Sequence, residues 1–263
     1  MKIITALLAC VMFFSAAMIV RETVRSKKEI AEFDQLAQLI KIEEDSDHSG
    51  KPSGSSDESD SDAETDEDGE EIGEPAPIFK RNLEPVFQQN PDCIGWICIE
   101  NTTVDYPVMF APETPQKYLR KSFSGSYSIS GTPFLNDNGG LDFDHLIIYG
   151  HNMKNGTMFS DIEGYLKSEY RDENPVVEFE TAEGLKCYEV FAAVCLKSTD
   201  QWYSFTNADD EADFDALISD IKGRSLYDTG ITPQYGEQIL TLSTCYGPKN
   251  DDRLVVIAAE IKP

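Results

Sequence analysis

The strongest constraint on the fold of this chain is a stretch of 32 residues, Glu43 to Glu74, with almost no large apolar side chains. It holds fifteen Asp and Glu residues against one Lys, so −14 of the formal net charge of −26 lies in it. Such a segment cannot bury enough apolar surface to offset the entropy lost on ordering. We therefore expect residues 43–77 to be a disordered, extended acidic spacer that divides the chain in two.

An apolar N-terminus precedes the spacer. Ile3 to Val20 are eighteen uncharged, mostly apolar residues, about 27 Å of helix and enough to cross a thin bilayer. We expect a transmembrane anchor over residues 1–20 and a membrane-proximal helix over residues 21–42. A cleaved signal peptide ending near residues 15–17 and a lipid anchor at Cys10 are the alternatives. The apolar residues of the second helix share one face: Val24, Ile30, Phe33, Leu36, Leu39 and Ile40.

Residues 78–263 have the composition of a globular domain. Short apolar runs bounded by turn signals predict strands, and helical spacing predicts a longer helix over Asp209–Tyr227. The expected strands are Ile94–Glu100, Thr103–Phe110, Thr132–Leu135, His145–Tyr149, Val176–Thr181, Leu185–Leu196, Gln238–Cys245 and Arg253–Ile261, with short helices near Thr114–Ser122 and Met158–Tyr165. Mostly short strands with a few inserted helices favour a β-barrel or a sandwich.

Charge and cysteine spacing exclude several classes of protein. An acidic surface argues against binding nucleic acid or anionic lipid through a charged patch. Outside the apolar N-terminus there are five cysteines, an odd number, so at least one thiol is unpaired within the monomer. Cys187 and Cys195 lie on one expected strand, about 26 Å apart and beyond disulfide reach. No CxxC pair is present, so we expect no zinc knuckle.

Only three histidines are present. His48 lies in the expected spacer and cannot hold a fixed geometry. His145 and His151 stand six residues apart on one strand-like run, about 20 Å if extended, so they cannot both serve one site. His151 lies where the strand gives way to a loop, a common place for functional side chains. We expect His145, at the start of the strand, to make a surface contact.

Cys245 and Arg253 border one loop. Cys245 ends an expected strand and Arg253 opens the returning one, so the two residues should lie close together. A guanidinium stabilises a thiolate and can donate to a developing oxyanion. With His151 they would supply the nucleophile, the acid/base and the charge stabiliser of acyl transfer through a thioester. The alternative is a buried structural cysteine beside a surface arginine.

These residues carry a family resemblance. Thr241-Leu242-Ser243-Thr244-Cys245, followed eight positions later by Arg253, resembles the signature of the sortases, and Tyr149-Gly150-His151-Asn152 resembles their histidine segment. The similarity runs from Gly95 to Ile261. The long insertion between Leu196 and Gln238 is most similar to class B sortases.

The resemblance implies an eight-stranded sortase-type β-barrel with short helices, one longer inserted helix at 209–227 and an N-terminal transmembrane helix. It implies a single-pass protein of a Gram-positive cell membrane with an extracellular catalytic domain. The positive-inside rule points the other way, because four basic residues follow the apolar run within residues 21–28.

The resemblance also implies a mechanism without metal or cofactor. Cys245 would attack the carbonyl of a threonine in the C-terminal sorting signal of a surface protein, His151 would exchange the proton, and Arg253 would hold the carbonyl or oxyanion. The acceptor would be an amine of a peptidoglycan precursor or of a pilin. By the same resemblance Leu119, Thr199, Tyr203 and Ser243 would contact the substrate. Trp202 would either stack on the substrate or belong to the core.

Two other functions compete with an enzyme. One is a membrane-tethered, non-catalytic surface binding module on the same barrel. The other is an acidic, ion-binding surface protein in which residues 43–74 are the functional part.

Overall fold

The computed structural model describes residues 2–42, 77–137 and 139–262, with side chains described from residue 11 onward. The α-helices are α1 (Lys2–Leu39), α2 (Glu84–Gln89), α3 (Ser168–Glu173) and α4 (Glu211–Gly223), and the 3-10 helices are η1 (Lys117–Arg120), η2 (Ser160–Leu166) and η3 (Gln201–Ser204). The strands are β1 (Cys93–Cys98), β2 (Asp105–Met109), β3 (Phe134–Leu135), β4 (His145–Tyr149), β5 (Val176–Thr181), β6 (Gly184–Lys197), β7 (Ile239–Cys245) and β8 (Asp252–Glu260).

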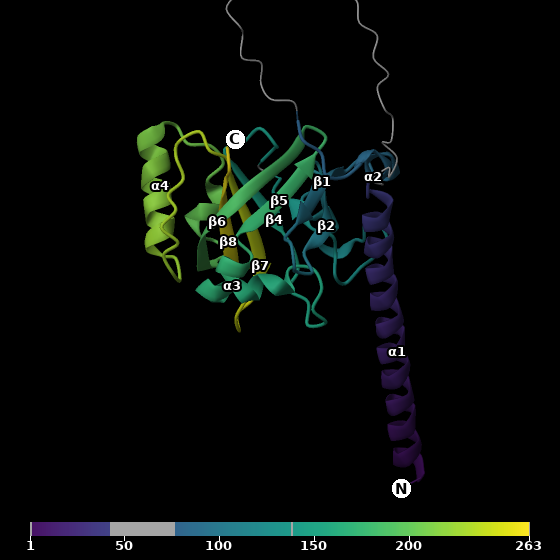
Figure 1. The fold of residues 1–263 in the computed structure, drawn as a ribbon. Helices are drawn as coiled ribbons and strands as arrows, with labels where there is room; N and C mark the ends of the chain where they lie inside the picture. Colours follow the sequence, from purple (N-terminus) through teal and green to yellow (C-terminus); the bar gives the residue numbers. More distant parts are fainter. Residues whose placement is uncertain (1, 43–76, 138, 263) are drawn as a thin grey trace, which may run out of the picture.

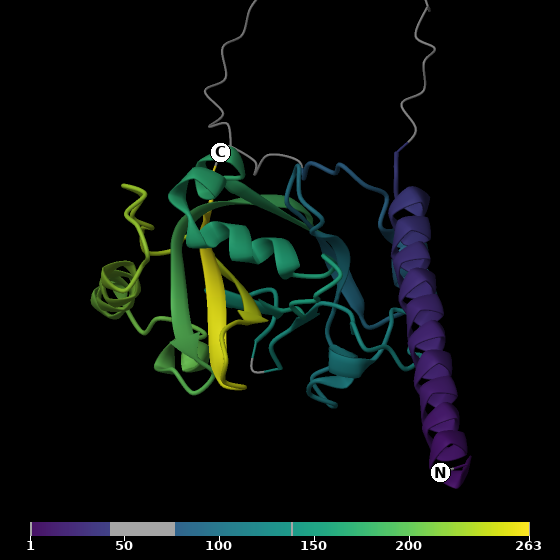
Figure 2. The same cartoon turned by 90° about the horizontal axis from the view of Figure 1, so that it is seen from below.

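The eight strands form a closed barrel in the order β1-β2-β3-β4-β7-β8-β6-β5, which confirms the predicted fold. The pairs β2–β3 and β4–β7 are parallel, and the other pairs are antiparallel. Helices α1 and α4 flank the barrel on opposite sides (Figures 1 and 2). The helix predicted at 209–227 is α4, which is shorter by a few residues at each end. The predicted helices near 114–122 and 158–165 are 3-10 helices over 117–120 and 160–166.

Alternate residues of β7 face two hydrophobic cores, because successive side chains of a strand point to opposite sides. Leu240 and Leu242 belong to the larger core, with side chains from every strand of the barrel wall around them. Ile239 belongs to a second core on the outer face, which is covered by Phe214 and Ile218 of α4. Strand β7 is therefore packed on both sides.

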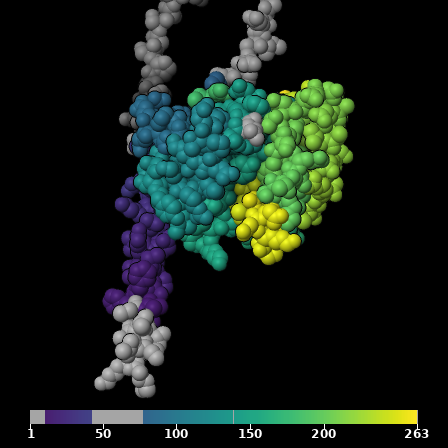
Figure 3. All heavy atoms as spheres, turned by 180° about the vertical axis from the view of Figure 1, so that it is seen from behind, coloured from purple at the N-terminus to yellow at the C-terminus, as the bar shows by residue number. Residues whose placement is uncertain are grey.

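Helix α1 is continuous where the sequence predicts an anchor and a separate membrane-proximal helix. Its C-terminal half packs on the barrel through Phe33 and Leu36, and Ile40, just after the helix, is also buried. Val24 is 61% and Leu39 46% exposed, so only part of the predicted apolar face is buried. The N-terminal part projects away from the body (Figure 3). Within the residues that the structure describes, no helix combines the length and the apolar character needed to cross a membrane. The transmembrane prediction for residues 1–20 thus stays a prediction.

The predicted spacer, apart from Pro77, lies outside the described residues, but its two flanks are close together. Lys41 and Arg81 form an antiparallel bridge, and the amide of Asn82 donates to the carbonyl of Ile40 at 2.8 Å. Arg81 is fastened to the barrel by an ion pair to the fully buried Glu180, 3.2 Å away. Residues 40–41 and 81–82, on the two sides of the spacer, therefore lie side by side.

Candidate active site

The ends of β4 and β7 bring His151 and Cys245 together. The two strands pair in parallel from His145–Ile239 to Tyr149–Ser243, and the same register continued by two residues sets His151 beside Cys245. Three hydrogen bonds extend the contact past the strand ends: Gly150 N to Ser243 O at 3.1 Å, Thr244 Oγ1 to Gly150 O at 2.8 Å and Asn152 Nδ2 to Cys245 O at 3.2 Å. Since neighbouring strands lie about 4.8 Å apart, the two side chains share one face at a short separation.

Arg253 joins them from β8. Cys245 and Arg253 are a directly opposed pair of the antiparallel β7–β8 ladder, so both side chains leave the same face. The loop between them is closed by a bond from Tyr246 N to Asp252 O at 3.2 Å. Within it, Gly247 has φ +94°, a conformation that glycine adopts without strain.

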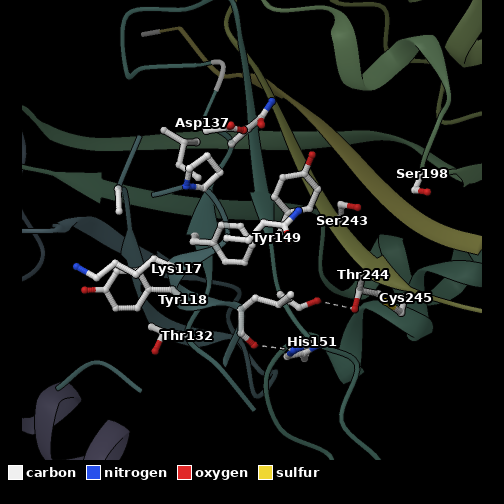
Figure 4. Close-up of a pocket in the computed structure, with 18 of the residues that line it drawn as sticks. Lys117, Tyr118, Thr132, Asp137, Tyr149, His151, Ser198, Ser243, Thr244 and Cys245 are labelled. Carbon is white, nitrogen blue, oxygen red and sulfur yellow. Dashed lines mark hydrogen bonds between the residues drawn. The ribbon is translucent and has the colours of Figure 1, made fainter. Parts of the chain in front are cut away.

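The three residues line one cavity of about 320 Å³, shown in Figure 4 with His151 and Cys245 on the same side of it. Leu119, Tyr203 and Ser243, predicted as substrate contacts, also line it. Thr199 does not; its neighbour Ser198 does. Lining residues absent from the sequence-based prediction come mostly from the segment 111–137 and include Lys117, Tyr118, Thr132, Asp137 and Tyr149. Of these, Tyr149 has a sequence signal, because it stands two residues before His151 on the same strand face.

The imidazole of His151 is half-buried and held by one backbone atom. Its Nε2 lies 2.9 Å from the carbonyl oxygen of Leu119. A carbonyl only accepts, so this bond requires the proton on Nε2 and leaves Nδ1 of the neutral ring as an acceptor. Burial lowers the pKa of His151 below its usual 6.5, the bond to Leu119 opposes that shift, and the charge of Arg120 adds to it. The fold therefore favours the neutral ring over the imidazolium.

Arg253 is held by its own loop. Its Nη1 donates to the carbonyls of Asn250 at 2.7 Å and Asp252 at 2.9 Å. The acidic side chains of this loop pair with Lys197, which contacts Asp252 and, at 3.4 Å, Asp251. The guanidinium thus has further donors to offer toward the cavity.

Two tyrosines form a second wall. The hydroxyl of Tyr203 lies 2.8 Å from Oγ of Ser243, and its ring stacks on that of Tyr149 with centroids 6.1 Å apart. Burial raises the pKa of Tyr203 to about 12, so the hydroxyl is protonated and can donate to a substrate carbonyl or to Ser243. The wall is apolar with one polar edge, which suits a peptide segment.

His145 is not at the surface, which corrects the expectation from sequence. It is 2% exposed, and its Nδ1 bonds to the carbonyl of Phe205 at 2.9 Å and its Nε2 to Oγ1 of Thr241 at 2.8 Å. Trp202 donates from Nε1 to the same Oγ1 at 3.1 Å and is itself 2% exposed. Burial lowers the pKa of His145 to about 4. Both residues are structural, and Trp202 belongs to the core.

The five cysteines outside the N-terminal helix are free, consistent with the unpaired thiol predicted from their number. Among the described residues, no three His, Cys, Asp or Glu side chains are grouped so as to hold a metal ion. Cys245 is therefore a free, exposed thiol at the edge of the cavity.

Comparison with known proteins gives one family. A family model described as the sortase domain matches residues 97–261. The chain is 33% identical over 175 residues to sortase B of Listeria monocytogenes, covering 65% of this chain and 70% of that protein. A solved Staphylococcus aureus sortase B–substrate complex is 28% identical with a TM-score of 0.64, over 69% of this chain and 85% of that one. A sortase B complexed with triglycine matches with the same identity and TM-score, over 69% and 86% of the two chains.

Proposed function

Because this chain belongs to the sortase family and is a cysteine transpeptidase of class B, we propose that it cleaves a C-terminal sorting signal after a threonine and transfers the protein to an amine. The observation that carries the proposal is the meeting of Cys245, His151 and Arg253 at the ends of three adjacent strands, around one cavity. These residue types supply a nucleophile, an acid/base and a charge stabiliser.

In the first step, the neutral imidazole of His151 takes the thiol proton of Cys245, and Sγ attacks the threonine carbonyl. The S–C bond forms, the carbonyl oxygen takes the negative charge, and Arg253 offers donors to it. The C–N bond then breaks as imidazolium His151 gives its proton to the leaving amine. The products are a thioester on Cys245 and the released C-terminal peptide.

In the second step, an amine attacks the thioester. His151 takes a proton from the incoming nitrogen, the new C–N bond forms, and the thiolate leaves. Nδ1 is the ring nitrogen suited to both transfers, because Nε2 is held by Leu119. We propose a peptidoglycan amine as acceptor, with a pilin lysine as the alternative; a relative complexed with triglycine supports a short peptide amine.

The proposal includes a cellular place. We propose that residues 1–20 attach the protein to the membrane of a Gram-positive cell, with residues 78–263 outside it. This rests on the uncharged run Ile3–Val20 and on membership of the family. Residues 43–77 would then be the acidic spacer between the membrane-proximal helix and the catalytic domain.

The test is peptide transfer by the purified enzyme. A library of fluorogenic peptides with threonine at a fixed position is incubated with triglycine, and products are identified by mass. We expect cleavage after threonine, a triglycine adduct, and an acyl-enzyme that hydroxylamine releases as the hydroxamate. The variants Cys245→Ala and His151→Ala should yield neither product. Cleavage that persists in Cys245→Ala, or a wild-type enzyme that transfers no peptide of the library, would contradict the proposal.

A further inference from the structure

Helix α1 contacts three loops, one of which lines the catalytic cavity, through polar side chains spaced three residues apart. Residues at this spacing lie on one face of a helix. The bonds run from Asn155 Nδ2 to Ser26 Oγ at 3.0 Å, from Ser130 Oγ to Glu29 Oε2 at 3.0 Å and from Ser124 N to Glu32 Oε1 at 3.1 Å. The bonding partners all lie outside the helices and strands, so the helix supports loop segments.

Glu29 is the unusual member of this face. It is only 8% exposed, and its Oε1 is buried without a hydrogen-bond partner among the described residues. Carboxylates are seldom buried with an unsatisfied oxygen, because desolvation costs free energy. Its other oxygen, Oε2, accepts from Oγ of Ser130. A buried carboxylate with one unsatisfied oxygen calls for an explanation, and its bond to Ser130 indicates where to look for one.

Ser130 belongs to the wall of the catalytic cavity. The next residue, Gly131, packs so closely on η1 that a Cβ there would lie 2.6 Å from the carbonyl oxygen of Tyr118 and 2.7 Å from that of Leu119. The following amide, of Thr132, donates to Tyr118 O at 3.1 Å. The segment 130–132 is therefore packed tightly against η1, and η1 carries the carbonyl that holds the imidazole of His151.

A second series of contacts connects α1 to the loop that follows His151. Phe33 of α1 packs edge-to-face on Tyr106, with ring centroids 5.3 Å apart. The hydroxyl of Tyr106 accepts from the amide of Met158 at 3.0 Å. Met158 pairs with Asn152, and the amide after it, of Phe159, donates to the carbonyl of His151 at 2.9 Å. The loop after His151 is thus tied to the same helix.

We propose that α1 is a positioning element of the transpeptidase, in which Glu29, through Ser130 and η1, sets the orientation of the His151 imidazole toward Cys245. This rests on the proposed function, since it assigns a task to that imidazole. Glu29 does not line the catalytic cavity and acts through its neighbours. A displacement of the ring by about 1 Å is enough to lower the rate by up to about 100-fold. A small shift of Ser130 and η1 should therefore produce a measurable decrease in kcat.

The experiment compares three full-length variants with wild type. Glu29→Ala removes the bond to Ser130, Glu29→Gln keeps an acceptor at the same place, and Glu22→Ala removes an exposed carboxylate from the same helix. We expect kcat of Glu29→Ala to fall about 10-fold with KM within about 2-fold, while Glu29→Gln and Glu22→Ala stay close to wild type. In a Ser130→Ala background, Glu29→Ala should cause no further loss.

A spectroscopic readout makes the result independent of turnover. In the Cys245→Ala background, ¹⁵N shifts of His151 report the tautomer, with the signal assigned by its absence in His151→Gln. We expect a single Nε2–H tautomer in the parent and in Glu29→Gln, and a mixture in Glu29→Ala. Equal kcat values and equal tautomers in Glu29→Ala and Glu22→Ala would overturn the inference. If wild type transfers nothing, the proposed function fails, and the tautomer still decides whether α1 positions the ring.

Discussion

Cys245 and Arg253 face each other as a directly opposed pair where β7 passes through its loop into β8. Seven residues of chain lie between them, and the pairing of the two strands sets their Cα atoms side by side. The guanidinium itself is oriented by the carbonyls of Asn250 and Asp252. The backbone thus presents a planar, forked donor next to the thiol.

Replacement of Arg253 should therefore affect the chemical step. Arg253→Ala removes the donors to the oxyanion, and we expect kcat to fall about 100- to 1,000-fold. Arg253→Lys keeps the charge but not the forked geometry and should recover only part of this loss. The measurement is steady-state peptide transfer, with Lys249→Ala as control, because Lys249 is an exposed cation of the same loop that does not line the cavity. Equal activity of Arg253→Ala and Lys249→Ala would refute the role.

Thiol reactivity should distinguish Cys245 from Cys195, the other exposed cysteine outside α1. Partial burial and the charge of Asp252 raise the pKa of Cys195, so less of it is thiolate at neutral pH. Burial raises the pKa of Cys93 to about 12 and that of Cys98 to about 11, so these should stay unmodified. With limiting methanethiosulfonate reagent, peptide mapping should find Cys245 modified first. Faster modification of Cys195 in the folded protein would contradict the site.

The bond between Tyr203 and Ser243 should contribute to substrate binding. Tyr203→Phe and Ser243→Ala each remove it, and we expect KM to rise about 3- to 10-fold, the effect of one hydrogen bond, with little change in kcat. Because the two residues act as a pair, the double variant should be no worse than either single one. Thr199→Ala serves as comparison, since Thr199 is exposed and outside the cavity. Additive effects would show that the residues act separately.

Acid should destabilise the protein through His145. Its pKa is about 4 in the fold against about 6.5 when unfolded. Between these values the unfolded chain binds more protons, so the stabilisation is complete above pH 6.5 and is lost as the pH falls toward 4. The difference amounts to about 3 kcal/mol. Urea unfolding at pH 4.5 and 7.5 should show a smaller acid-induced loss in His145→Gln than in wild type, and equal losses would be inconsistent with a neutral buried histidine.

Removal of the acidic segment should leave the enzyme intact. Its flanks meet at Lys41 and Arg81, so replacing residues 43–76, 34 residues in all, by about eight Gly and Ser residues requires no rearrangement. The shorter loop should raise the free energy of unfolding by about 1 kcal/mol, with kcat/KM unchanged. Thermal unfolding and peptide transfer measure both. Loss of transfer in a folded variant would instead favour a functional role for the segment, as in the ion-binding alternative.

The strands could be predicted from sequence because short apolar runs bounded by turn residues are local patterns. Those patterns leave a barrel or a sandwich open, and the choice of a barrel and of the candidate site residues comes from the resemblance carried by local motifs such as Thr241–Cys245. Leu119 was expected to contact the substrate, but its bond to His151 could not be predicted from sequence. The atom that holds the imidazole is a backbone carbonyl, and its position depends on the packing of Gly131. The polar docking of α1 has no sequence signal, because Glu29 resembles a solvated helix residue until its partner Ser130, 101 positions away, is known.

The buried hydrogen bonds of His145 have a consequence for the opposite end of the same strands. His145 on β4 and Thr241 on β7 meet only when the two strands are aligned as they are. A slip by one residue would turn every side chain of a strand to its other face, carrying Cys245 toward the barrel interior. The bonds of His145 therefore favour the observed alignment of β4 and β7, because a shifted alignment would leave its buried ring nitrogens without partners. That alignment in turn sets the relative positions of His151 and Cys245 at the other end of the strands.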